Sequence, residues 1–517
     1  MNNLFTITNK LFKKIKIIDI FAVIIASILL LPILIFVIEG ISSIVKGGNS
    51  LATSTDRSAI LGTLKILFLT GFFGGGLGII NGWLLSNCEF RFRKILRICQ
   101  LIPLAAPSYL VTAILKDLGS SMFGYQVTGL WWGVLILSIS TYPYVFLLTN
   151  ESFNKFGVNQ INASRGLGIG PWKSFFKIAL PMALPALATG ISLMSMEIIN
   201  ELGTFELLNL PSISTGMREN WIAQGDTSGS TGLSLFSLLI VFSLIGIEKF
   251  SRRGTKRWSE NPSLNRSQGW ELKKIRSILA IVISLFPAIF SLGLPLVWII
   301  YNNDLIFRGL TSELIILTLR TVGVGAIASI LIIIFSLVVS LANRWNKTNL
   351  MKAITFMSGI GYAIPGTLLA LMFFTLKRIF HISYNYDFVI LIFGYVVRFL
   401  TISKGSLDSA LERISPNLDE AATGLGASWA QVIRKIHIPI LKGPIFVGSL
   451  LVIVDSIKEL PIAFTLRPSD FDTLAVRVYI YAGEERLSEA ILPAILIILL
   501  GLIASSTLIP SLEPNKD

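Results

Sequence analysis

Long apolar runs constrain this chain more than any other feature of its sequence. About twelve runs lie along the 517 residues, each close to the roughly 20 residues that a helix needs to cross a bilayer. Only 14% of the residues are charged, against about 25% in an average soluble protein. The alternative, a large soluble α-helical protein with buried helices, would need many apolar runs of 18 or more residues. We therefore expect an all-α polytopic membrane protein.

The boundaries of the predicted spans are approximate by a few residues. Basic residues precede the first run, which is too long for the core of a signal peptide, so we expect an uncleaved first span. The expected spans cover residues 17–39, 60–86, 99–116, 130–149, 182–203, 232–249, 276–301, 313–342, 356–376, 387–403, 441–464 and 488–509.

The net charge of +14 is explained by the distribution of Lys and Arg over the loops. If the spans alternate from a cytoplasmic N-terminus, most of the basic residues fall on the cytoplasmic side, with many in the central stretch 250–275. This asymmetry predicts that both termini are cytoplasmic. It also accounts for the basic composition without a nucleic-acid partner. The two cysteines, Cys88 and Cys99, have no metal-ligand spacing and are expected to be free thiols.

The chain repeats itself at an offset of 258 positions, half of its length. The polar stretch 415–444 aligns at this offset with residues 157–183. Pro107 aligns in the same way with Pro365. We predict a tandem duplication, with a first repeat at 1–258 and a second at 259–517. Six spans in each repeat give both the same orientation, with a pseudo-twofold axis along the membrane normal.

Each polar stretch is predicted to form two short helices joined by a glycine turn. Pro416 suits the first turn of a helix, where its missing N–H has no partner to lose. Gly424 and Gly426 permit a turn with positive φ. Pro439 is expected to end the second helix.

The paired stretches resemble the cytoplasmic EAA loops of ABC importer permeases. The pattern of a Glu-Ala-Ala triplet, a glycine and a later Ile-x-x-Pro ending is intact in the second copy and altered in the first, where Asn replaces Glu and Ser replaces Ala. The residues that carry the resemblance are Glu420, Ala421, Ala422 and Gly426 in the second copy and Asn162, Ala163, Ser164 and Gly168 in the first.

This resemblance implies a type I ABC importer permease fold with two parallel-oriented six-helix repeats in the bacterial inner membrane. In the family, each EAA loop docks on an ATPase subunit, so two copies of the ATPase and a periplasmic substrate-binding protein are implied partners. No GxxxxGK[ST] phosphate loop occurs in the chain, so Mg-ATP is expected only on the partner and no cofactor on this chain. Because Asn162 cannot form an ion pair, the loop with Glu420 is expected to carry more of the coupling.

The double-length chain, with SIKELPIAFTLRP at 456–468 and FDTLAVRVYIYAGEERL at 471–487, resembles ferric-iron uptake permeases. Related permeases carry thiamine, phosphonates, polyamines, sulfate or molybdate, so these substrates remain alternatives. An ion-coupled secondary transporter and a membrane scaffold are further alternatives. The secondary transporter gains nothing from two EAA-type loops, and the scaffold would not need buried paired acids in both halves.

Acidic residues near the ends of two spans are candidates for the translocation path. They repeat at the same offset, and the two in each copy lie four residues apart on one helix face: Glu197, Glu201, Asp455 and Glu459. Carboxylates suit a hard cation such as Fe³⁺. Ion pairing with Lys458, Arg320 or Arg398, or docking of the binding protein, are the alternatives. Pro107 and Pro365 are expected to kink the third span of each repeat and to shape a gate, or to serve packing alone. The metal ligands are not identified by the sequence.

Overall fold

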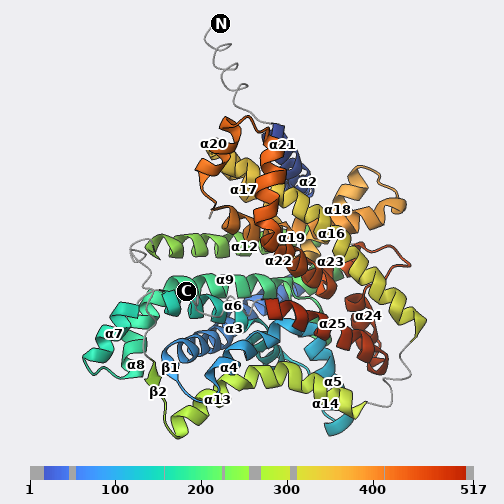
Figure 1. Ribbon diagram of the computed structural model, residues 1–517. Helices are drawn as coiled ribbons and strands as arrows, with labels where there is room; N and C mark the ends of the chain where they lie inside the picture. Colours follow the sequence, from blue (N-terminus) through green and yellow to red (C-terminus); the bar gives the residue numbers. More distant parts are fainter. Residues whose placement is uncertain are drawn as a thin grey trace. The chain divides into compact units, whose positions relative to one another are not determined.

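The computed structural model describes residues 17–45, 54–155, 158–223, 227–255, 269–302, 311–412 and 414–507. Within these ranges the chain is almost entirely helical, and nine helices are long and apolar enough to cross a membrane. A tenth candidate is a pair of helices bent by 86°, Arg93–Ala105 and Ser108–Phe123. The expectation of an all-α polytopic membrane protein is confirmed (Figure 1).

The sequence repeat is visible helix by helix. Corresponding helices in the two halves begin 258 residues apart or nearly so, and several also end 258 residues apart. The main pairs are α3 (Ser54–Asn87) with α16 (Ser312–Trp345), α5 (Ser108–Phe123) with α18 (Gly366–Ile379), α6 (Leu130–Lys155) with α19 (Asp387–Glu412), and α9 (Leu180–Asn200) with α22 (Ile438–Lys458).

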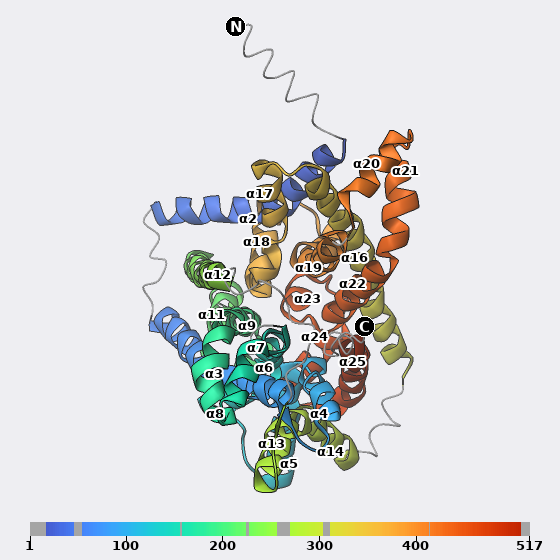
Figure 2. The same ribbon diagram turned by 60° about the vertical axis from the view of Figure 1, so that its left-hand side comes forward.

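The chain folds into two compact units, and each unit combines segments from both halves of the sequence. The first unit contains Met1–Ile41 and Leu319–Asp472, and the second contains Ser42–Thr318 and Thr473–Asp517. Helix α2 (Ile17–Val45) therefore packs with elements of the second half of the sequence, beside α17 (Asn349–Ser358) (Figure 2). A compact unit is defined by contacts and a repeat by sequence, so this division does not test the boundary at 258.

The first span of the second half is held by polar contacts to helices of the first half, all within one unit. This span consists of α13 (Ile275–Ala288), a π-helical turn (Ile289–Gly293) and α14 (Leu294–Tyr301). Gln100 Nε2 donates to the Ser284 carbonyl at 2.7 Å, and Ser284 Oγ donates to Asn81 Oδ1 at 2.9 Å. Buried polar groups must find such partners, so these bonds specify where α13 packs.

The C-terminal helices pack in the same unit. Helix α24 (Leu474–Gly483) lies against α25 (Leu487–Thr507), and α25 also packs on the short 3₁₀ helix Ile102–Ala105. Gly501 faces the Ala105 backbone so closely that a Cβ atom would clash with it. Glycine at this position permits the approach.

The third span of each half is broken rather than kinked, which corrects the expectation for 99–116 and 356–376. Pro107 and Pro365 each stand at the N-cap of the following helix, α5 or α18, with φ near −55°. The residues before them, Ala106 and Ile364, are extended. A proline disfavours the helical region for the residue that precedes it, so the helix ends there and a new one begins.

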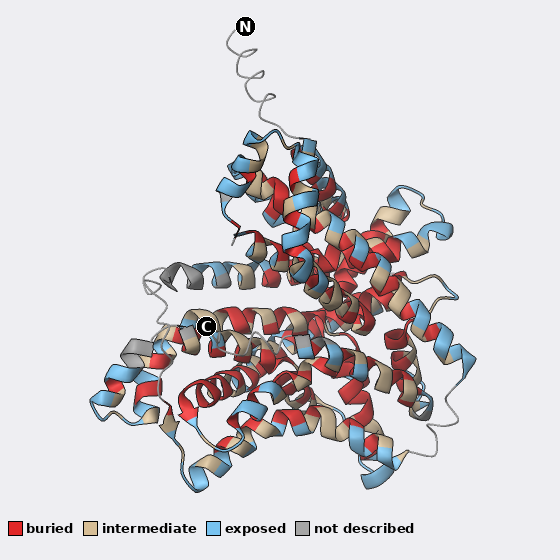
Figure 3. Ribbon diagram, viewed as in Figure 1, coloured by how far each residue is buried: buried red, intermediate tan, exposed pale blue. Residues whose placement is uncertain are grey.

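The core of each unit lies between its long helices (Figure 3). The short helices formed by the two polar stretches are largely exposed. Exposed apolar side chains are abundant along the predicted spans, for example Phe68, Phe72 and Ile330. Lipid is the expected neighbour of such surfaces.

Candidate functional site

The two polar stretches fold into matching helical hairpins. The first begins with α7 (Val158–Gly166) and α8 (Pro171–Ser174), and the second with α20 (Pro416–Gly424) and α21 (Trp429–Val432). All four boundaries correspond at the offset of 258. We call them hairpin 1 and hairpin 2.

The glycine turn of each hairpin has the same geometry. Gly168 has φ +73° and Gly426 has φ +86°, the left-handed conformation that favours glycine. The N–H of Ile169 donates to the Ser164 carbonyl and that of Ala427 to the Ala422 carbonyl, both at 3.0 Å. This is the closing bond of a Schellman motif. Gly424 is the last residue of α20 and does not adopt positive φ, so only Gly426 matches the expectation of a positive-φ turn.

Pro439 does not end the second helix, which corrects the prediction made from its position. The helix runs without a break from Trp429 to Lys458. A π-helical turn, Ile433–His437, precedes the proline, and the Ile438 N–H bonds to the Ile433 carbonyl. Hairpin 1 has the same turn before Pro181, at Phe175–Ala179. The wider turn accommodates a proline that lacks an N–H, so each hairpin is joined rigidly to a span.

The motif residues divide into exposed and buried positions in a similar way in the two hairpins. Asn162 and Ala163 are exposed in hairpin 1, as are Glu420 and Ala421 in hairpin 2. Ser164 is buried and its hydroxyl lies 2.8 Å from that of Ser174, whereas Ala422 is half-buried. Each hairpin thus presents the first two motif positions to solvent.

A pair of leucines at the tips was missed by the sequence reasoning. Leu167 and Leu425 are 80% and 90% exposed, and they stand 258 positions apart, each directly before the turn glycine. Both side chains are therefore accessible to a partner surface. Their shared offset was the sequence signal that could have found them.

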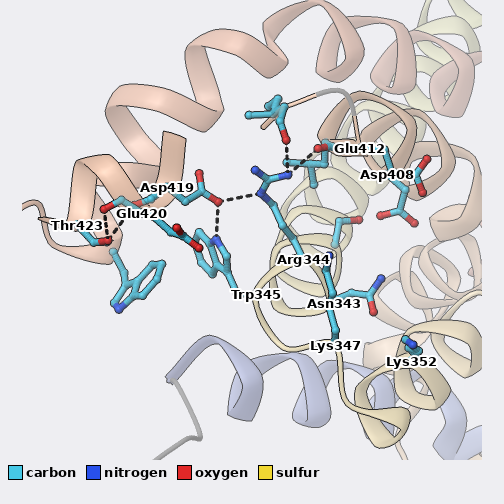
Figure 4. Close-up of a pocket in the computed structure, with 14 residues that line it drawn as sticks. Asn343, Arg344, Trp345, Lys347, Lys352, Asp408, Glu412, Asp419, Glu420 and Thr423 are labelled. Atoms are coloured by element: carbon cyan, nitrogen blue, oxygen red, sulfur yellow. Dashed lines mark hydrogen bonds and ion pairs between the residues drawn. The ribbon is translucent and has the colours of Figure 1, made fainter. Parts of the chain in front are cut away.

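Hairpin 2 is anchored by a buried polar cluster that sequence reasoning also missed. Asp419 Oδ2 accepts hydrogen bonds from Arg344 Nε and Trp345 Nε1, both at 2.9 Å (Figure 4). His437 Nε2 lies 3.0 Å from Asp419 Oδ1. Arg344 also donates to the carbonyls of Leu411 and Ile414.

The electrostatics of this cluster favour a charged Asp419. Burial raises the pKa of this carboxyl, but the hydrogen bonds from Arg344 and Trp345 and the positive charges nearby lower it more, so the pKa lies below its ordinary value. The aligned residues in hairpin 1 and its span are Ile161, Ser86 and Asn87, which cannot form such a cluster.

A polar pocket of about 780 Å³ opens beside this cluster, entirely within one unit (Figure 4). We call it the α20 pocket. Its lining includes four acidic and three basic side chains together with apolar and neutral polar residues. The lining residues are Ser340, Asn343, Arg344, Trp345, Lys347, Lys352, Asp408, Leu411, Glu412, Ile414, Asp419, Glu420, Thr423 and Trp429.

Hairpin 1 is anchored by the chain segment that connects the two halves. Trp270 and Glu271 form strand β2, which pairs in parallel with strand β1 (Cys88–Glu89). Arg165 Nη1 donates to the Gly269 carbonyl at 3.0 Å. Trp270 packs with Trp83, at 5.5 Å between ring centroids, in an apolar cluster that includes Phe153 and Phe175.

The acidic residues of the spans are divided between the two units, two in each. Glu201 and Glu459 have the same local role, because each follows the end of its span and accepts a hydrogen bond from the N–H of a residue three positions on, Thr204 at 2.9 Å and Ile462 at 3.2 Å. They thereby satisfy a backbone N–H in the first turn of each of two short helices, α10 (Gly203–Leu207) and α23 (Pro461–Leu466).

The remaining contacts of these acids differ. Glu459 forms a buried ion pair with Arg398 at 3.1 Å, and Asp455 pairs with Lys458 at 2.8 Å. Glu201 instead accepts a hydrogen bond from Ser108 at 2.5 Å. The ion-pair alternative weighed for the sequence is therefore observed for the two acids of the second half. Arg320 bonds to the carbonyl of Asp470.

Within the described ranges, no group of three or more His, Cys, Asp or Glu side chains lies close enough to hold a metal ion. Both cysteines are free, as expected, and burial raises the pKa of the Cys88 thiol to about 12.

Comparisons with known proteins agree with the repeat. A family profile described as "Binding-protein-dependent transport system inner membrane component" matches residues 74–257 and again 339–516, together more than half of the chain. The chain is 21% identical over 435 residues to the Fe(3+)-transport system permease protein FbpB 2 of Haemophilus influenzae, covering 82% of this chain and 84% of the relative.

Two shorter relatives match parts of the chain. The molybdenum transport system permease protein ModB of Escherichia coli is 28% identical over 224 residues, 40% of this chain and 97% of the relative. The sulfate transport system permease protein CysT of Escherichia coli is 27% identical over 151 residues, 27% of this chain and 54% of the relative.

Proposed function

Because the chain belongs to the family of binding-protein-dependent transport system inner membrane components, we propose that it is the double-length membrane permease of an ATP-driven importer. The observation that carries the proposal is the pair of matching hairpins, each with a left-handed glycine turn and an exposed leucine at its tip. Two equivalent docking elements on one chain suit two copies of one partner. Each hairpin continues through a π-helical turn into a span, so a push on the hairpin is transmitted to the membrane helix.

The proposed partner at the hairpins is an ABC ATPase subunit, in two copies, which binds Mg-ATP and hydrolyses it. The exposed Leu167 and Leu425 would enter apolar grooves on its surface, and Glu420 would pair with a basic or polar group beside the groove. A periplasmic binding protein would deliver the substrate on the opposite side. In this proposal both hairpins and both termini lie in the cytoplasm, and the chain lies in the bacterial inner membrane.

Ferric iron is the proposed substrate. The support is the similarity to an iron-transport permease over most of both chains, whereas the molybdenum and sulfate permeases match about half of this chain or less. Carboxylates near the ends of the spans suit a hard cation better than an anion. Molybdate, sulfate, thiamine, phosphonate and polyamine remain the competing substrates.

We assign the four acids to the translocation path with unequal roles. Glu459 and Asp455 are already neutralised by Arg398 and Lys458. Glu201 instead has hydroxyl and backbone partners, and Glu197 is half-buried, so we assign the closer contact with a passing cation to these two carboxyls. The breaks at Pro107 and Pro365 would let α5 and α18 move as separate gate segments.

The test is transport by the complete complex of permease, ATPase and binding protein in proteoliposomes. Fe³⁺, molybdate, sulfate, thiamine and a polyamine are offered in competition, and ATP-dependent uptake of Fe³⁺ is expected to dominate. Uptake of another substrate in preference to Fe³⁺ would refute the iron assignment alone. Absence of any stable complex with an ATPase would refute the importer proposal itself.

The path assignment is tested separately with the double variant Glu197→Gln and Glu201→Gln, because Glu459→Gln would leave the buried Arg398 without its carboxylate. We expect reduced iron uptake with normal assembly of the complex. Normal uptake together with normal assembly would exclude these two acids from the path.

A further inference from the structure

The α20 pocket lies at the level where membrane-spanning helices end. Two candidate spans, Ser312–Trp345 and Tyr384–Glu412, end at residues that line the pocket, and a third, Trp429–Lys458, begins at one. Tryptophans such as Trp345 and Trp429 are enriched at the boundary between lipid and water. The pocket is therefore placed at the depth of the phospholipid headgroups.

One wall of the pocket can donate several hydrogen bonds to an anion. Ser340 and Asn343 lie three residues apart on one face of α16. Lys347 follows the end of this helix, and Lys352 comes from α17. Ser340 is 2% exposed, and its hydroxyl has no hydrogen-bond partner among the described residues. A buried hydroxyl without a partner is costly, so its position on the pocket wall points to a ligand that bonds to it.

A second wall offers acceptors. Asp408 and Glu412 lie four residues apart on one face of α19. Figure 4 shows them in the upper part of the view, whereas Asn343, Lys347 and Lys352 lie in the lower part. The pocket thus separates its donors from its acceptors.

The ion pairs around the pocket leave charge of both signs for a ligand. Asp408 is paired with Lys404 at 2.7 Å, and Asp419 with Arg344 at 2.9 Å. The exposed charges that line the pocket then include two lysines on the donor wall and Glu412 on the acceptor wall. A simple anion would meet Glu412, and a simple cation would meet the lysines. A phosphate that stands next to hydrogen-bond donors satisfies both walls.

We propose that the α20 pocket binds the headgroup of a phospholipid whose phosphodiester stands next to hydrogen-bond donors, either hydroxyls or an ammonium. The phosphate oxygens accept hydrogen bonds from Ser340, Asn343 and Lys347, and the headgroup donors bind Glu412. The volume of about 780 Å³ suits such a group, since pockets for small ligands measure roughly 300–1,000 Å³. Thr423 of α20 lines the same pocket, so the bound lipid also contacts hairpin 2.

The first half of the chain does not repeat this site. The residues that align with the three phosphate-binding positions are Gly82, Leu85 and Glu89, which offer no matching donor side chain. Strand β2 pairs with the strand that contains Glu89. One lipid site per chain is therefore expected. Lys94, which aligns with Lys352 and is also exposed, provides a matched control.

Native mass spectrometry of the purified full-length permease measures the binding. Phosphatidylglycerol and phosphatidylethanolamine are each offered in competition with phosphatidylcholine, which has the phosphate but no donor in its headgroup. We expect one molecule of either donor-bearing lipid to be retained per chain in preference to phosphatidylcholine. Ser340→Ala is expected to weaken this binding at least about tenfold, because it removes a hydrogen bond to a charged group. It should not lower the unfolding temperature of the lipid-free protein, because the hydroxyl has no partner in the protein.

The charged walls are tested by exposed residues, whose replacement leaves the fold intact. Lys352→Gln is expected to weaken binding several-fold and Lys94→Gln to leave it unchanged, whereas Glu412→Ala should abolish the preference over phosphatidylcholine. Equal retention of the three lipids overturns the proposal, as does binding that Ser340→Ala and Lys352→Gln leave unchanged. In a further arm, tighter binding of soluble glycerophosphoglycerol than of phosphatidylglycerol overturns the assignment to a membrane lipid. These measurements depend neither on the transported substrate nor on the ATPase.

Discussion

Hairpin 1 and hairpin 2 have the same backbone conformation but are held in place by different contacts. Their helices, turn glycines and π-helical turns coincide at the offset of 258. Hairpin 2 rests on the charged cluster of Asp419, Arg344 and His437, whereas hairpin 1 rests on a hydroxyl pair and on the segment that contains Trp270. The surface that we propose to meet the ATPase is thus duplicated, while the support beneath it has diverged. Variants of aligned residues can separate the contribution of the docking surface from that of the support beneath it.

The largest effect is expected from Asp419→Ala. This change leaves Arg344, whose side chain is only 11% exposed, without its carboxylate, and breaking a buried ion pair costs about 3 kcal/mol. We expect a lower unfolding temperature of the purified permease and loss of ATPase stimulation. The matched change in hairpin 1, Ser164→Ala, removes a neutral hydrogen bond worth about 1 kcal/mol. Similar unfolding temperatures for the two variants would show that the supports are energetically equal.

Next in size are the leucine variants, Leu425→Ala and Leu167→Ala. Both side chains are exposed, so we expect no change in unfolding temperature. Burial of a leucine in an interface contributes about 2 kcal/mol, so each variant is expected to weaken ATPase binding by roughly 10- to 30-fold. Titration of the ATPase onto the reconstituted permease measures this. If one leucine matters and the other does not, then the two docking surfaces are unequal despite their shared backbone.

The Glu420→Ala and Asn162→Ala pair probes the motif itself. Both positions are exposed, but only Glu420 can form an ion pair with the partner. We expect Glu420→Ala to reduce uptake and ATPase stimulation more than Asn162→Ala does. The reason is the loss of an exposed ion pair with the partner, which contributes up to about 1 kcal/mol. Uptake and ATP hydrolysis are measured on the same vesicles. Equal losses would contradict the stronger role of hairpin 2.

The smallest difference is expected between Gly168→Ala and Gly426→Ala. Both glycines have positive φ, which costs a residue with a side chain about 1 kcal/mol. Because the turn geometry is the same, the two variants should lower the unfolding temperature of the purified permease to the same degree. A marked inequality would show that the two turns differ in how well they tolerate a side chain.

Much of the hairpin could be predicted from the sequence because it depends on local interactions. The glycine turn is specified by the residue that tolerates positive φ. At Pro107 and Pro365 the sequence predicted kinks, whereas the structure has complete breaks between helices. Pro439 shows the limit of this reasoning. A π-helical turn before Pro439 lets the helix continue through the proline. Nothing in the local sequence pattern distinguishes a continuing helix of this kind from a helix that ends at the proline.

The hydropathy of the runs and the offset of 258 determined the helical membrane class, the duplication and the matching hairpins, since apolar length and repetition are properties of the sequence alone. Only the tertiary structure decided that α2 packs with the second half and α13 with the first, and that Asp419 meets Arg344 and His437. Those contacts join residues far apart in the chain. They depend on which buried polar groups find partners once the helices pack, and hydropathy carries no information about that choice.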